Sequence, residues 1–217
     1  MRQSTNPWFL SVLEEKSRGS VTRVQERLHW FCAHPAAHAS FLNTLSLMEH
    51  IGSRKIMTSQ SGIHLSHGTL KHLAEETRHA FFFKREAEKL ARRDLDYGAA
   101  NTIGGAFARA YMGRLDAAIA RDVEDMAEPA LPYLYMSLIV ELRAVWLYRL
   151  YQAVLAEQRS GITLKSVLAE EELHLAAMLA RLSALDEHVA SRVERFCVLE
   201  NARFHALWDA IEESVSS

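Results

Sequence analysis

Glu76-Thr77-Arg78-His79 and Glu171-Glu172-Leu173-His174 are the two stretches that decide the fold of this 217-residue chain. In each, a glutamate precedes a histidine by three residues, a spacing that places both side chains on one face of an α-helix. The first face continues through Leu73, Ala80, Phe83, Ala87 and Leu90, and the second through Leu164, Leu168, Leu175, Met178, Leu182 and Leu185. Since a carboxylate on an apolar face is costly without a partner, both stretches predict long helices that carry an acid and an imidazole inward.

Two further glutamates interrupt apolar faces in the same way. Glu49 is in register with Leu42, Leu45, Gly52 and Ile56, and Glu141 with Leu134, Leu138, Val145 and Tyr148. The segment 133–151 around Glu141 is apolar nearly all round, with Arg143 and Arg149 as its other charges. A bare carboxylate in such a helix needs a cation or a proton.

The Glu-x-x-His spacing alone is a weak signal, because a third example occurs between Glu26 and His29. Glu26 lies opposite the apolar face formed by Val21, Val24, Leu28 and Phe31, so we interpret this example as a surface pair. Position on the apolar face, not the motif, therefore distinguishes the candidate ligands.

The rest of the chain predicts an all-α protein. Helical periodicity covers most of it, and no segment shows the alternation of apolar and polar residues that is typical of strands. We expect helices at about 21–31, 36–56, 66–93, within 94–128, from Pro132 to 157, from an N-cap at Thr163 to 185, and at 189–211, with a turn at 59–62. No repeat or linker divides the chain, so residues 1–217 are expected to form a single domain with its core bundle at about 36–185.

Charge and composition exclude several classes of function. Lys and Arg total 25 against 27 Asp and Glu, so the chain has no basic surplus for binding nucleic acid. The apolar run 129–140 is too short to cross a bilayer, and the N-terminus runs into Trp8-Phe9-Leu10 rather than a secretory leader, so a cytoplasmic location is expected. Cys32 and Cys197 do not have the spacing of a thiolate metal site.

The charge of the inward side chains indicates a metal centre. Four glutamates carry four negative charges, which two divalent ions would balance, whereas without metal they would have to take up protons. An oxygen-rich set with one imidazole for each ion suits Fe or Mn better than a structural Zn site.

At this point the chain resembles the ferritin-like di-iron carboxylate proteins, whose four-helix bundles supply a Glu from each of two helices and Glu-x-x-His from each of the others. The resemblance covers about residues 36–185, and Glu76 to Ala80 looks like the second-helix signature of the oxygenase-type members. It implies an all-α, ferritin-like four-helix bundle with a long crossover, to which extra flanking helices are added. It also implies that one half of the site consists of Glu49, Glu76 and His79 and the other of Glu141, Glu171 and His174, with Glu76 and Glu171 as bridging carboxylates.

The resemblance further implies a non-haem di-iron oxidoreductase or oxygenase that activates O2 and oxidises a small organic substrate. Its cofactors would be two Fe ions, with Mn/Fe or Mn as variants, and its partners would include a reductase or ferredoxin and a second copy in a homodimer. No catalytic residue is assigned outside the metal centre. Three alternatives remain: a ferritin-type iron-binding protein or ferroxidase, a metal-dependent bundle of the haem-oxygenase-like type, and a metal-free helical interaction module.

Two other residues are candidates for an extra ligand or for a hydrogen-bond partner of a ligand. His72 lies one helical turn before Glu76, although capping or surface roles are favoured. Glu200 is in register with Val193, Phe204, Leu207 and Ile211, and a glutamate satisfied by other groups is an equal alternative. For the aromatic residues Phe81 to Phe83 and Trp146, Tyr148 and Tyr151, core packing is favoured over lining a substrate or oxygen channel.

Overall fold

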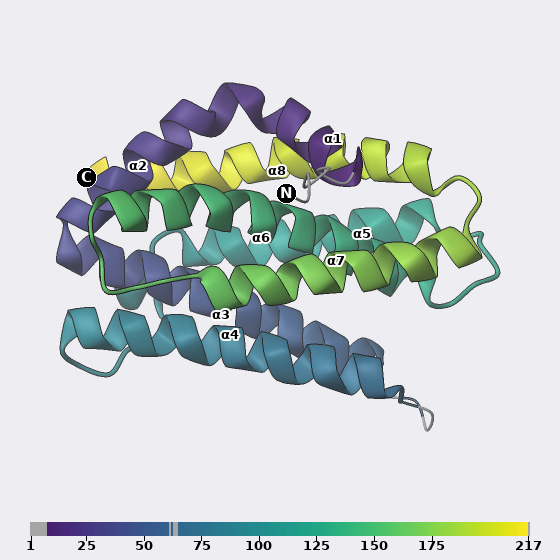
Figure 1. Cartoon of the computed structure of the whole chain (residues 1–217), viewed down its shortest axis with the longest axis horizontal. Coiled ribbons are helices and arrows are strands. Elements are labelled where there is room, and N and C mark those ends of the chain that lie inside the picture. Colours follow the sequence, from purple (N-terminus) through teal and green to yellow (C-terminus); the bar gives the residue numbers. More distant parts are fainter. Residues whose placement is uncertain (1–7, 61, 63–64, 217) are drawn as a thin grey trace, which may run out of the picture.

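The computed structural model describes residues 8–60, 62 and 65–216 and shows a helical bundle (Figure 1). No β-strand occurs among these residues, as the sequence predicts. The α-helices are α1 (Trp8–Ser17), α2 (Val21–Ala33), α3 (Pro35–Ser59), α4 (His67–Ala91), α5 (Gly105–Asp122), α6 (Leu131–Glu157), α7 (Lys165–Leu185) and α8 (Val189–Ser216).

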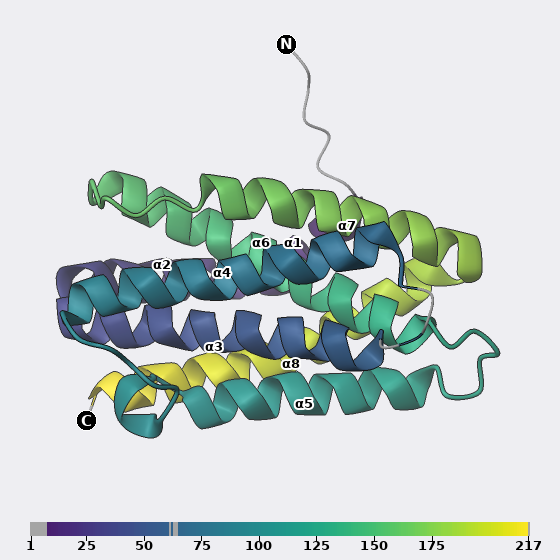
Figure 2. The same cartoon turned by 90° about the horizontal axis from the view of Figure 1, so that it is seen from below.

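Two helical hairpins form the centre of the bundle. α3 packs along α4, and α6 packs along α7, so that four long helices lie side by side (Figures 1 and 2). The crossover between the hairpins contains α5, which lies next to α8 on the side of α3 (Figure 2). α1 and α2 pack against α6, and α1 also contacts α8. Helices outside the hairpins therefore cover α6.

Local sequence explains most helix ends. Pro35 begins α3 at a position where its missing N–H costs nothing. The Ser66 side chain caps α4 by accepting a hydrogen bond of 3.0 Å from the Thr69 backbone N–H. Arg92 ends the same helix with a left-handed φ of 54°. The predicted turn at 59–62 begins where α3 ends, but Ser61 lies outside the described residues, as do residues 1–7.

Two local predictions are wrong. The helix α1, which the sequence analysis did not predict, includes Trp8-Phe9-Leu10 and buries Phe9, Leu10 and Leu13 in the core. Thr163 does not cap α7: the residue before the helix is Leu164, and its backbone N–H donates to Gln152 Oε1 at 2.6 Å. A side chain from α6 thus takes the role that the sequence assigned to a local threonine.

No helix in the described part of the chain is both long and apolar enough to span a bilayer.

Candidate metal centre

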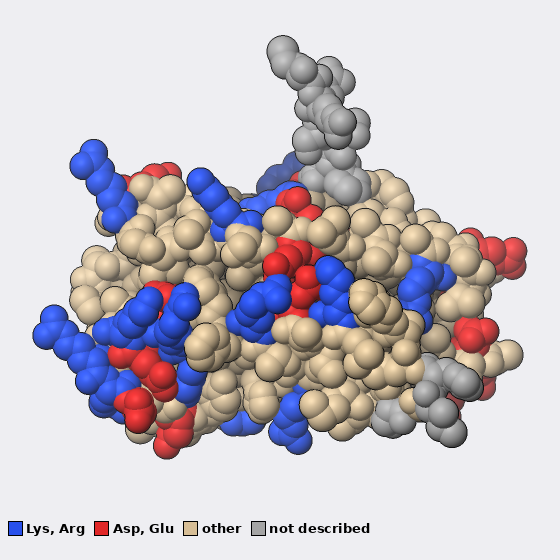
Figure 3. All heavy atoms as spheres, turned by 60° about the horizontal axis from the view of Figure 1, so that its bottom comes forward, with Lys and Arg blue, Asp and Glu red and all other residues tan. Residues whose placement is uncertain are grey.

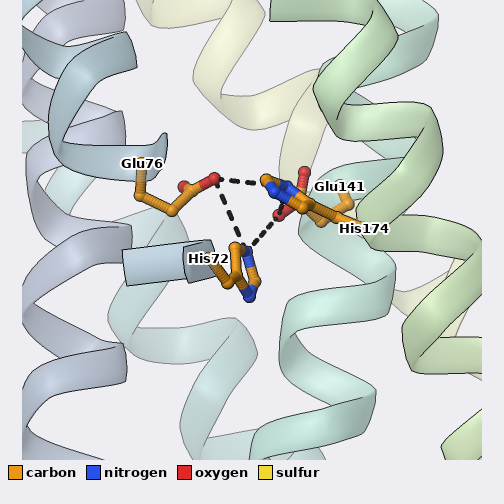
Figure 4. A group of neighbouring side chains, drawn as sticks. All are labelled: His72, Glu76, Glu141 and His174. Carbon is orange, nitrogen blue, oxygen red and sulfur yellow. Dashed lines mark hydrogen bonds and ion pairs between the residues drawn. The ribbon is translucent and has the colours of Figure 1, made fainter. Parts of the chain in front are cut away.

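The four central helices bring seven acidic and imidazole side chains together inside the bundle. All are buried, with at most 9% of any residue exposed. They form two groups. Within each group, every residue contributes one potential ligand atom, and these atoms all lie within 4.8 Å of one another. One group contains His72, Glu76, Glu141 and His174 (Figure 4), and the other contains Glu49, Glu76, His79 and Glu171.

Two carboxylates connect the groups. Glu76 belongs to both. Glu171 Oε1 lies 3.0 Å from His79 Nδ1, and Glu171 Oε2 lies 3.0 Å from His174 Nδ1. The sequence analysis placed Glu171 with Glu141 in one half of the site, whereas in the structure this carboxylate reaches an imidazole from each group. Both residues expected to bridge therefore lie between the two groups.

The hydrogen bonding of these residues is incomplete in a way that fits metal ions. Among the described residues, Glu76 Oε1, His79 Nδ1 and Glu171 Oε1 are buried atoms without a hydrogen-bond partner. Such atoms are rare in proteins because each loses its contact with water. His79 Nδ1 and Glu171 Oε1 are close but not aligned for a hydrogen bond, so both can face a common cation. The donor set thus fits two metal ions.

The outer nitrogens of both motif histidines are held by carboxylates from the opposite helix. His79 Nε2 on α4 lies 2.8 Å from Glu170 Oε2 on α7, and His174 Nε2 on α7 lies 2.9 Å from Glu75 Oε2 on α4. With a proton on Nε2, each imidazole presents its Nδ1 lone pair to the centre, as a metal ligand must. The crossed pairs thus orient both histidines.

Basic side chains in turn hold the outer carboxylates. Arg78 Nη2 lies 2.6 Å from Glu170 Oε2, and Lys71 Nζ lies 2.6 Å from Glu75 Oε1. Figure 3 shows acidic and basic side chains interleaved on the face of the molecule turned forward there. The sequence analysis missed Glu75 and Glu170, although each motif begins with a doublet, Glu-Glu-x-x-His, that would have indicated them.

Glu75→Ala or Glu170→Ala is expected to weaken metal binding by about 10- to 100-fold, because each removes the group that orients one imidazole. Titration of the metal-free protein with Fe(II) or Mn(II) measures the change in affinity. Glu172→Ala is the matched control, since Glu172 lies on α7 but pairs with Arg149 at the surface. Equal affinities for all three variants would show that the crossed pairs do not support the ligands.

His72 is part of the centre. Its Nε2 lies 3.1 Å from Glu141 Oε1 and 3.5 Å from Glu76 Oε1, and its Nδ1 lies 3.3 Å from the Tyr133 hydroxyl. The favoured capping or surface role was wrong, because Ser66 caps α4 and His72 is buried. Its place one turn before Glu76 brings a third imidazole to the same helix face.

Glu200 lies outside both groups. It is fully buried, and it accepts hydrogen bonds from Arg143 Nε at 2.8 Å, from Arg143 Nη2 at 2.6 Å and from the Tyr111 hydroxyl at 2.7 Å. The suggestion that Glu200 is an extra ligand is therefore corrected: its oxygens are satisfied by a cation from α6. In the sequence, Arg143 had no evident partner.

The pKa values of the clustered side chains favour bound protons when no metal is present. Burial lowers the pKa of the three imidazoles, but the adjacent carboxylates outweigh it and raise the pKa to about 9 for His72, about 10 for His79 and about 11 for His174. Burial and the neighbouring Glu76 raise the pKa of Glu49 well above its usual value. Without metal, bound protons neutralise the cluster, so metal ions must displace them.

The metal-free protein is expected to lose stability as the pH rises from about 7 to about 10. The folded pKa values of the imidazoles exceed the unfolded value of about 6.5. Their contribution to stability is therefore complete below that value and is lost as the pH passes through about 9 to 11. The raised pKa of Glu49 acts in the same direction.

Urea unfolding of chelator-treated protein at several pH values measures this loss. Protein loaded with Mn(II) serves as the control and should lose less stability, since the ions replace the protons. A free energy of unfolding that rises with pH in the metal-free protein would contradict the raised pKa values.

A cavity of about 60 Å³ adjoins the carboxylates. Glu49, Glu76 and Glu141 line it together with apolar side chains, and the Tyr148 hydroxyl donates a hydrogen bond to Glu49 Oε1. Gly52 also lines the cavity, where a Cβ atom would lie 3.2 Å from Glu76 Oε2 and crowd that carboxylate. Tyr148 is buried, as core packing predicts, and also lines a space next to the centre.

Comparison with known proteins does not identify a relative. No family model matches the sequence, and no similar protein was found among the curated proteins or the solved structures.

Proposed function

We propose that this chain is a non-haem di-metal oxidoreductase of the ferritin-like di-iron carboxylate type, which uses O2 to oxidise a small organic molecule. The observation that carries the proposal is the position of Glu76 and Glu171 between two Glu/His groups, with buried atoms of both left without hydrogen-bond partners. Carboxylate oxygens and imidazole nitrogens that lack hydrogen-bond partners within the protein are suitable ligands for Fe and Mn.

Each residue has a definite part in this proposal. Glu49 and His79 would hold one ion and Glu141, His72 and His174 the other, and Glu76 and Glu171 would contribute to both. Fe ions held there would supply electrons and open coordination positions for O2. The protein orients the imidazoles through Glu75 and Glu170 and limits water in the apolar cavity, and the Tyr148 hydroxyl donates a hydrogen bond to Glu49.

The third imidazole, His72, favours the haem-oxygenase-like alternative to some extent, because that type uses additional histidines. The two Glu-x-x-His motifs nevertheless face one another from α4 and α7, as in the ferritin-like pattern. The cavity beside the carboxylates is largely apolar, which suits O2 and an organic group better than the passage of hydrated Fe(II) required for a ferroxidase.

The test is the reaction of the loaded protein with O2. The metal-free protein is loaded anaerobically with about two Fe(II) per chain, and O2 consumption and the absorbance change are followed after mixing with O2. We expect rapid oxidation of the bound iron, with further O2 consumption when a reductant is added. A control variant, Glu26→Ala, alters the surface Glu-x-x-His and should react like the parent.

Other outcomes would overturn the proposal. Reduced, loaded protein that does not react with O2 excludes the oxidoreductase. Continued uptake of Fe(II) far beyond the stoichiometry of the centre, together with a large shell by light scattering, identifies a ferritin-type protein instead.

A further inference from the structure

Two of the spaces that adjoin the candidate metal centre reach different atoms of it. A surface cleft of about 630 Å³ is lined by Glu75, Tyr133, His72 and His174. Tyr133 and Glu75 contact the outward nitrogens of these histidines, His72 Nδ1 and His174 Nε2. A molecule in this cleft would contact the outward-facing sides of the imidazoles, whereas the cavity beside the carboxylates is lined by the carboxylates themselves.

One end of this cavity is formed by α5 and α8, which lie side by side, and α5 also packs against α3 (Figure 2). Tyr111 on α5 and Leu207 on α8 line the cavity there. The same two residues also line a groove of about 280 Å³ on the outer surface of α5 and α8. Because both are buried, they form a partition between the groove and the cavity.

The groove has an apolar floor and two arginines. Ala110, Ala202 and Ala206 keep it shallow, and the exposed ring of Phe107 stands at its edge. Arg114 and Arg203 complete the lining, and neither has an acidic partner in the described part of the chain. The Nε atom of Arg203 is buried and has no hydrogen-bond partner among the described residues.

These two arginines differ from the arginines of α2 and α6 that pair with acidic side chains of α8. Arg23 contacts both Asp209 and Glu212 of α8, each at 2.6 Å, and Arg143 is paired with Glu200 of α8. In the groove, two guanidinium groups face an apolar surface without such carboxylates. The complementary ligand is an anion, and a carboxylate matches the guanidinium fork.

We propose that the groove and the cavity together bind an elongated small molecule with an apolar body and one carboxylate group. Arg114 and Arg203 hold the carboxylate in the groove, and the apolar end passes Tyr111 and Leu207 toward the metal-facing glutamates. Entry requires movement of the Leu207 side chain. The inference deepens the proposed function, since the buried end would be the part oxidised, but binding itself does not require the metal.

Straight-chain carboxylates from butanoate to decanoate are suitable probes. Isothermal titration calorimetry on the full-length, metal-free protein should show an affinity that rises about fourfold for each added CH2 until the cavity is full. The double variant Arg114→Gln/Arg203→Gln should bind decanoate at least about tenfold more weakly, while binding of neutral 1-decanol stays unchanged. Ala144→Leu, which fills part of the cavity, should end the rise about three carbons earlier.

Arg181→Gln is the matched control, because Arg181 lines the opposite cleft and also has no acidic partner among the described residues. No binding of decanoate to the parent protein would overturn the inference. So would a loss of affinity in Arg181→Gln but not in the groove variant, which would place the ligand in the cleft. Metal content, measured separately, tests the proposed function: metal binding without decanoate binding overturns only this inference.

Discussion

Replacing Glu76 and Glu171 together by alanine is expected to remove nearly all of the metal that the parent protein binds, for which we expect about two ions per chain. These residues lie between the two ligand groups, so each ion loses part of its ligand set when they are removed. Elemental analysis of protein expressed with added iron measures the loss. Far-UV circular dichroism shows whether the helices persist in the variant.

The matched control is Glu26→Ala/His29→Ala, which removes a Glu-x-x-His that lies on α2, away from the centre. It should retain the metal content of the parent. An absence of metal from the parent, combined with greater stability of the Glu76→Ala/Glu171→Ala variant, would mean that the inward acids are structural. The enzyme hypothesis would then be dropped.

Glu200→Ala is expected to lower the free energy of unfolding by about 3–5 kcal/mol, because it leaves the Arg143 guanidinium buried without its carboxylate. Glu200 is fully buried, and its partner is also buried with Ser17 and Asn201 as further contacts. Urea unfolding at neutral pH measures the change. Metal content should remain that of the parent, since Glu200 lies outside both ligand groups.

The double variant Arg143→Leu/Glu200→Leu distinguishes the ion pair from simple packing. Apolar replacement of both partners is expected to recover most of the stability lost in Glu200→Ala. If Glu200→Ala instead lost metal without losing stability, Glu200 would be a ligand.

The helices and the inward-facing glutamates could be predicted because each is visible in the spacing of apolar residues, which repeats about every 3.6 residues along a single helix. Glu49, Glu76, Glu141 and Glu171 each stood out against the apolar residues of its own face, and the structure brings all of them together. These four glutamates could therefore be identified from the periodicity of each helix alone, before the arrangement of the helices was known.

Interactions between helices could not be predicted in this way. Glu75 and Glu170 precede the inward glutamates by one residue, so helical periodicity turns them away from the centre and toward the surface. Their partners are known only when α4 and α7 are placed side by side. The pairing of Arg143 with Glu200 joins two helices far apart in the sequence.

The crossed hydrogen bonds make the two hairpins interdependent. His79 on α4 is held by Glu170 on α7, and His174 on α7 is held by Glu75 on α4. Neither hairpin on its own contains a complete half of the centre, because each supplies an imidazole and the other supplies its support. A fragment or transplant that carries one hairpin would therefore lack the carboxylate that orients its own imidazole.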